Sequence, residues 1–189
     1  MKKHFKHILI LPLMLTMILS IAAPLRAETS IDPLAKYKEY RIKALFLYNF
    51  ANYVEWPNVA FESHDSPIKL CLFGNVPFGS FLSHVDGTLI RDRKLKIIRS
   101  SVLSEIESGC HTLFVGTDRL DLIEELFTNL NHVYVLSIGN VEGFIDKGGI
   151  INILRTQDMQ QFDIDLAKAI QNGLLVDSDM LRLARIINK

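Results

Sequence analysis

The sequence IKLCLFGNVPFG, residues 68–79, decides the fold prediction, because it joins a strand and a turn in one short stretch. The apolar run Ile68–Phe73, which follows Pro67, is typical of a buried strand. Gly74–Gly79 then predicts a tight turn, and a short helix through about Val85 is expected after it. The stretch therefore predicts a strand, a turn and a helix in succession.

The same alternation continues toward the C-terminus. Thr117 or Asp118 can cap a helix that runs to about Asn129. Because strands alternate with helices, we expect a mainly parallel sheet that is covered on both faces. The strands predicted in this part are residues 95–99, 112–115 and 133–137. A short helix is predicted at residues 102–107.

The two ends of the chain complete the expected architecture. Tyr40–Tyr53 has apolar residues at the spacing of an amphipathic helix, and Met159–Ile164 alternates after Ile150–Leu154, which predicts a hairpin. Two closing helices are expected, Leu166–Gln171 and Ser178–Ile187, the second capped by its first residue. We therefore predict a single layered α/β domain with a mixed, mainly parallel sheet flanked by helices, a C-terminal β-hairpin and two closing helices. The first helix is expected to face the core with Ile42, Leu45, Phe46, Phe50, Tyr53 and Val54.

Residues 1–27 have the pattern of a secretory signal peptide. Lysines precede an apolar run from Ile8 to Ala23, which is shorter than the roughly 20 residues of a membrane span and leads to a small residue, Ala27. We expect cleavage near Ala27 and a mature domain of residues 28–189; an uncleaved N-terminal anchor is the alternative.

The charge balance of the mature chain argues against nucleic-acid binding. The full sequence has 21 basic and 21 acidic side chains, and residues 1–27 contain four of the basic ones and no acid, which leaves 17 − 21 = −4. A net negative charge disfavours nucleic acids and anionic membranes as partners.

The chain has two cysteines, Cys71 and Cys110. An exported protein with an even number of cysteines can pair them in an oxidising compartment. Two buried free thiols are the alternative, because free cysteine behaves as a small core residue.

Asn49 and Trp56 stand out near the end of the first helix. Asn49 falls between Phe46 and Phe50 on the predicted inward stripe, so its amide is expected to bond the backbone of a neighbouring segment as a structural clamp. Pro57 ends the helix, and Trp56 is expected to seal the end of the core.

The turn containing Gly74, Asn75 and Gly79 has two interpretations. A turn between a strand and a helix can hold an anion or a nucleotide-like ligand with its backbone N–H groups. However, Ser80-Phe81 follows the second glycine in place of Lys-Ser/Thr, and the G-x-G-x-x-G spacing is absent. A simple tight turn is the favoured interpretation.

No motif predicts a specific reaction, a metal site or a cofactor. Cys110-His111 suggests a cysteine nucleophile, but sequence neighbours at the start of a strand point to opposite sides. Asp163 and Asp165 share one side of a strand, as acids on a solvated face commonly do. We therefore expect a protein that is not an enzyme. The remaining histidines considered, which show no metal-ligand spacing, are His64, His84 and His132.

A β-branched stretch follows Gly143 and Phe144 and continues past Gly148-Gly149. Its side chains are either core or a surface that a partner covers. Core is the default, and Phe144, Ile150 and Ile151 are the candidate partner-binding residues.

Taken together and in this order, several stretches make the mature chain resemble the YfiR family of periplasmic proteins. The resemblance covers nearly all of the chain after residue 27. It rests on Lys43–Phe50 with Val54–Pro57, Cys71–Gly74 with Pro77–Gly79, Cys110 and the strand after it, Gly143-Phe144 with Gly148–Asn152, and Phe162–Ala169 with Gly173-Leu174 and Leu181–Ala184.

The resemblance implies a periplasmic repressor that binds the periplasmic sensor domain of an inner-membrane diguanylate cyclase and lowers cyclic-di-GMP synthesis and biofilm formation. It also implies a homodimer, disulfides, and release by an outer-membrane lipoprotein or an envelope signal. A second cysteine pair of some members is absent near Gly148-Gly149, and Asp165 stands where an asparagine is expected. The alternative function is a periplasmic small-ligand binding protein that uses the Gly74–Gly79 turn.

Overall fold

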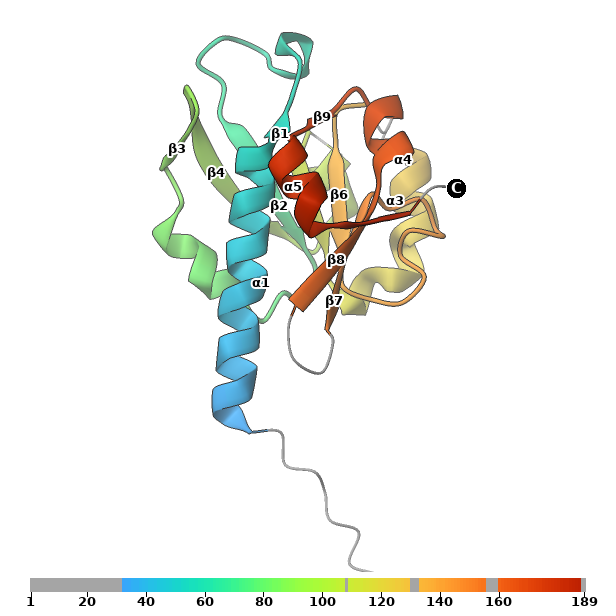
Figure 1. Ribbon diagram of the computed structural model, residues 1–189. Helices are drawn as coiled ribbons and strands as arrows, with labels where there is room; N and C mark the ends of the chain where they lie inside the picture. The colour runs from blue at the N-terminus through green and yellow to red at the C-terminus, as the bar shows by residue number, and fades with distance from the viewer. Residues whose placement is uncertain (1–31, 108, 130–132, 156–159, 188–189) are drawn as a thin grey trace, which may run out of the picture. The chain divides into compact units, whose positions relative to one another are not determined.

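The computed structural model describes residues 32–107, 109–129, 133–155 and 160–187 (Figure 1). The predicted signal peptide lies outside these residues. The described part has the architecture predicted from the sequence: one mainly parallel sheet with helices on both faces and a hairpin near the C-terminus.

The main sheet has eight strands in the order β10-β8-β7-β6-β5-β2-β4-β3. All neighbouring pairs are parallel except β7–β8, which is the predicted hairpin, and β3–β4 at the edge. A separate antiparallel pair joins β1 to β9. The strands are β1 Val54–Glu55, β2 Ile68–Phe73, β3 Leu89–Ile90, β4 Arg93–Ser100, β5 Thr112–Val115, β6 Leu136–Gly139, β7 Ile151–Arg155, β8 Gln160–Asp165, β9 Leu175–Val176 and β10 Arg185–Ile187.

The helices divide between the two faces of this sheet. Leu70 and Leu72 of β2 belong to one core with residues of α1, η2 and α5, whereas Cys71 and Phe73 belong to a second core with α2 and α3. Burial on both faces explains why β2 is a continuous apolar run. The α-helices are α1 Pro33–Tyr53, α2 Leu103–Glu107, α3 Ile123–Asn129, α4 Leu166–Gln171 and α5 Ser178–Leu183, and the 3₁₀-helices are η1 Asn58–Ala60, η2 Gly79–His84 and η3 Thr117–Leu122.

The core-facing side of α1 differs from the prediction. Phe50 and Val54 are buried as expected, but Ile42 and Leu45 are 40% and 55% exposed. Their places in the core are taken by Lys43, Ala44, Leu47 and Ala51. Apolar residues lie on two opposite sides of this helix. Both sides show the apolar spacing of an amphipathic helix, so this spacing does not identify the side that packs on the sheet.

The C-terminal end also corrects the prediction. The last helix stops at Leu183, and residues 185–187 form β10, which pairs in parallel with β8. Its cap is Asp177, whose carboxylate accepts a hydrogen bond from the N–H of Asp179, and not Ser178. Pairing of residues 185–187 with β8 therefore determines the structure here, although the sequence pattern of these residues is helical.

Candidate functional site

The glycine turn after β2 is already filled by a carboxylate of the same chain. Gly74 has a φ of +83°, which favours glycine, and its N–H donates to the carbonyl of Ser100 at 2.8 Å. The next N–H, of Asn75, donates to Oδ1 of Asp118 at 2.8 Å. The N–H of Gly79 donates to the carbonyl of Val76 at 2.9 Å. The N–H groups of Gly74, Asn75 and Gly79, the three residues singled out as an anion seat, are therefore all engaged within the protein.

This turn lies where open α/β sheets commonly bind ligands. The chain leaves β2 for β4 on one side and later returns to β5 on the other, so the loops after β2 and β5 flank a switch point. Here Asp118, from the loop after β5, bridges to Asn75, and Arg119 lies directly on Gly74, within 2.5 Å of where a Cβ would be. An external anion would have to displace the Asp118 carboxylate, so the geometry gives the small-ligand alternative no support.

Cys71 and Cys110 form a disulfide, with Cα atoms 5.9 Å apart. Cys71 lies in β2, Cys110 lies two residues before the neighbouring strand β5, and both are buried in the second core. A disulfide was expected here in preference to two free thiols, because an oxidising compartment favours pairing of cysteines. Since the bond consumes the Cys110 thiol, the Cys110-His111 pair contains no nucleophile.

His111 is buried and acts as a structural cross-link. Its Nδ1 accepts a hydrogen bond from the N–H of Lys69 at 3.0 Å, and its Nε2 is 3.1 Å from the carbonyl oxygen of Ala60, to which the neutral ring can donate. Its ring stacks on Phe61 with centroids 4.4 Å apart. Burial is the main reason that the pKa of His111 falls to about 4, with the positive charges of Lys69 and Arg93 as smaller contributions.

Arg93 completes this cluster from the other side of Phe61. Its guanidinium lies 3.7 Å from the centre of the Phe61 ring and donates to the carbonyl oxygens of Ser63, His64 and Ser66 at 2.7–3.0 Å. The irregular segment after η1 is thus held by one buried arginine. Sequence pattern did not predict this cluster, because its members are separated along the chain and match no known spacing.

The two candidate acids have separate structural roles. Asp163 accepts two hydrogen bonds from Arg185 of β10, at 2.7 and 2.6 Å, and these bonds raise the pKa of Arg185. Asp165 caps α4 by accepting from the N–H of Lys168 at 2.8 Å. Among the residues that the structure describes, no three His, Cys, Asp or Glu side chains are grouped so as to hold a metal ion.

The clamp near the end of α1 is made by Trp56. Its Nε1 donates to the carbonyl oxygen of Tyr134 at 3.0 Å, which connects two segments 78 residues apart. Tyr134 has a φ of +68°, unusual for a residue with a side chain, and its own N–H is bound to the carbonyl of Asn172. Asn49 is half-buried, and its side chain makes no hydrogen bond to another segment within the described ranges.

Phe144, Ile150 and Ile151 are fully buried. The Phe144 ring lies between Gly139 and Gly149, where an added Cβ would come within 2.4 and 2.2 Å of the ring. The Asn152 side chain exchanges two hydrogen bonds with the backbone of Val141, which holds the same loop. These three side chains have the core role that was the default interpretation, and in this conformation a partner cannot touch them.

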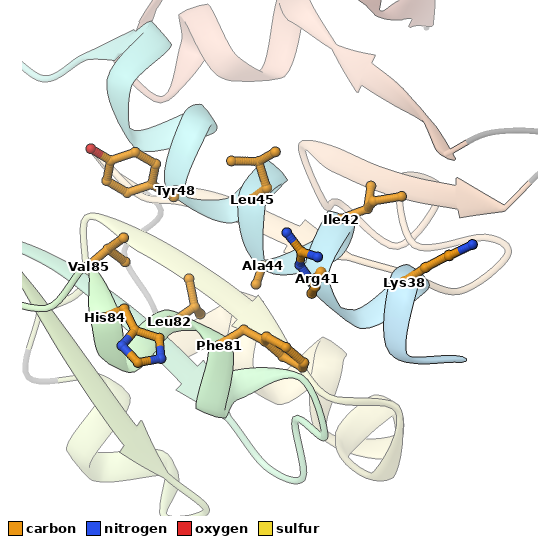
Figure 2. A pocket seen from close by; sticks show the side chains of 10 residues that line it. All are labelled: Lys38, Arg41, Ile42, Ala44, Leu45, Tyr48, Phe81, Leu82, His84 and Val85. Carbon is orange, nitrogen blue, oxygen red and sulfur yellow. The ribbon is translucent and has the colours of Figure 1, made fainter. Parts of the chain in front are cut away.

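A groove with a volume of about 450 Å³ lies between α1 and η2 (Figure 2). Ala44 on α1 and Leu82 on η2 point toward one another across it. The sequence signal that could have revealed it is the second apolar side of α1. The groove is lined by Lys38, Arg41, Ile42, Ala44, Leu45, Tyr48, Phe81, Leu82, His84 and Val85.

These features define a disulfide-linked three-layer α/β domain that presents a surface groove. The sequence matches the YfiR/HmsC-like family model over residues 40–185, and the chain belongs to this family. YfiR-like proteins are periplasmic regulators of diguanylate cyclases rather than enzymes, and family membership supports a role of that class. In the described part of the chain, no helix combines the length and apolarity needed to cross a bilayer.

Solved structures are similar in fold only. A conserved domain protein from Vibrio cholerae O1 biovar El Tor shares 9% identity, with a TM-score of 0.51, over 78% of this chain and 59% of that one. An ABC domain in complex with L-Trp from Streptococcus pneumoniae shares 9% identity, with a TM-score of 0.47, over 64% of this chain and 55% of that one. The chain therefore spans less than two thirds of either protein. No curated protein matches it.

Proposed function

We propose that this protein binds the periplasmic sensor domain of an inner-membrane diguanylate cyclase and represses cyclic-di-GMP synthesis, and with it biofilm formation. The observation that carries the proposal is the YfiR/HmsC-like family match over residues 40–185. The Cys71–Cys110 disulfide supports it, because such bonds persist in oxidising compartments. In this proposal residues 1–27 direct export, and residues 28–189 form the mature domain.

The mechanism needs binding and no chemistry. A repressor that binds the inactive state of the cyclase more tightly than the active state shifts the population toward the inactive state. A tenfold difference in affinity between the two states corresponds to about 1.4 kcal/mol. Relief would come from a competing partner, which we take to be an outer-membrane lipoprotein, and the repressor would act as a homodimer.

Deletion of the gene in a strain that expresses the cognate cyclase tests the proposal. We expect cyclic-di-GMP, measured by mass spectrometry of cell extracts, to rise and to return to the original value when the wild-type gene is restored. The purified protein should also bind the isolated periplasmic domain of that cyclase. Unchanged cyclic-di-GMP in the deletion strain would contradict the proposal.

A further inference from the structure

The N-terminal helix α1 has an exposed apolar face opposite its core face. Leu34, Tyr37, Ile42 and Leu45 lie on this side of the helix and are 40–58% exposed. Leu47 and Phe50 lie on the opposite side and are buried in the core. An apolar stripe that continues over several turns on the solvent side of a helix is a mark of an interaction surface.

This face continues into the groove between α1 and η2 (Figure 2). From Leu34 to Tyr48 the surface is about 20 Å long, at about 1.5 Å per residue. That length matches roughly four turns of a second helix. None of the residues that line the groove belongs to a strand, so the groove itself offers no strand edge to which a β-strand could be added.

Cations line this apolar surface. Lys38 and Arg41 lie along the groove, and neither forms an ion pair with a carboxylate in the described part of the chain. Arg41 lies over the ring of Tyr37, 5.9 Å from its centre. Since none of the lining residues is acidic, the surface favours a partner that brings carboxylates to it.

A second copy of this protein is a poor occupant. In a homodimer a two-fold axis through the middle of the stripe would bring the two copies of Arg41 together, with Lys38 adding more charge of the same sign. Like charges placed against one another disfavour such a contact. The surface therefore fits a different protein.

We infer that the groove formed by α1 and η2 is the docking site for an amphipathic helix with acidic flanks, contributed by the periplasmic domain of the cyclase. The apolar side of that helix lies on Ile42, Leu45, Phe81 and Val85, and its carboxylates meet Lys38 and Arg41. This inference rests on the proposed function.

Binding of the purified cyclase periplasmic domain to four variants tests the inference. Leu45→Asp and Arg41→Glu alter the groove, while Val59→Asp and Lys94→Glu make the same changes at exposed positions elsewhere. All four replace exposed side chains, and circular dichroism and thermal melting verify the fold. We expect the two groove variants to raise Kd roughly tenfold or more, and the two controls to leave it unchanged. Added salt should weaken wild-type binding more than Arg41→Glu binding.

The same variants expressed in the deletion strain separate this inference from the proposed function. Failure of Leu45→Asp and Arg41→Glu to restore repression, while both controls restore it, supports the groove. If both groove variants bind and repress like the wild type, the groove is not the docking site, although the proposed function stands. If deletion leaves cyclic-di-GMP unchanged and the wild type does not bind the cyclase, both are overturned.

Discussion

At the scale of single residues, the charge state of His111 is coupled to stability. The neutral ring is bound from both sides, by Lys69 and Ala60, and packs on Phe61. Protonation would replace the acceptor at Nδ1 with a donor that faces the N–H of Lys69. The folded state therefore keeps His111 neutral at pH values where the unfolded chain already binds a proton.

We predict that this difference lowers stability on acidification between pH 6.5 and about 4. The pKa of His111 falls from 6.5 to about 4 on folding, so the unfolded state binds more protons in this interval. The contribution is complete above pH 6.5 and is lost as the pH falls toward 4, to a total of about 3 kcal/mol. Urea unfolding of the wild type and His111→Gln at several pH values measures it. The two stabilities should converge toward pH 4, and parallel pH curves would contradict the prediction.

The sequence predicted the kinds of residue in the candidate sites but not their partners. Gly74 and Asn75 were predicted as a tight turn, with anion binding as the other interpretation, yet the carboxylate that binds Asn75 comes from Asp118, 43 residues away. The clamp predicted for Asn49 is provided by Trp56 and Tyr134. Such pairings depend on the tertiary arrangement, which local spacing does not encode.

At the scale of elements, Arg93 organises the segment between η1 and β2. Three carbonyl oxygens and the Phe61 ring depend on a single guanidinium. Lysine cannot reproduce the packing on Phe61, because an ammonium lacks the planar group that lies over the ring. The segment has no strand or helix of its own between Phe61 and Pro67, so its order depends on this side chain.

We predict that Arg93→Ala and Arg93→Lys make residues 61–66 sensitive to proteolysis. Loss of the three hydrogen bonds should also lower the free energy of unfolding, by about 1–3 kcal/mol for the alanine variant. Limited proteolysis with mass spectrometry locates the cleavage, and Lys94→Ala, an exposed neighbour, is the matched control. Equal cleavage rates in all proteins would show that Arg93 does not hold the segment.

The positions of helices and strands were predicted correctly where the local sequence pattern agrees with the packing in the folded protein. Strands β2 and β5 were predicted with their observed bounds, because buried parallel strands are short apolar runs. The predicted orientation of α1 was wrong, because Ile42 and Leu45 follow the same helical spacing as the residues that are buried in the core. Strand β10 was missed because Arg185–Ile187 also continues a helical pattern, and only the pairing with β8 decides the outcome.

At the scale of the whole molecule, the disulfide closes a segment with a sequence separation of 39 residues that contains β3, β4 and α2. Because Cys71 is 0% and Cys110 5% exposed, a reductant has little access to the bond in the folded protein. This favours a structural role for the bond over a rapid redox response.

We predict that the double variant Cys71→Ala/Cys110→Ala loses about 4 kcal/mol of unfolding free energy, from the loop that becomes free in the unfolded chain. Urea unfolding of the oxidised wild type and of the cysteine-free variant measures the difference. Thiol trapping of the wild type should detect reduction with dithiothreitol only when denaturant is present. Fast reduction without denaturant would contradict the structural role.

The packing of α1 also has a consequence for when the protein folds. Its core face meets residues that are synthesised more than 100 positions later: Phe50 packs on Phe162 at 4.9 Å, and the carbonyl of Tyr53 accepts from the N–H of Asp177. Contacts this distant in sequence form late, because a long loop must close first. The contacts of α1 with Phe162 and Asp177 thus form only after the C-terminal third of the chain is made, whereas η2, on which Tyr37 packs through Phe81, is made much earlier. In the exported protein that we propose, the core around α1 is therefore completed only by the last segments of the chain to be synthesised.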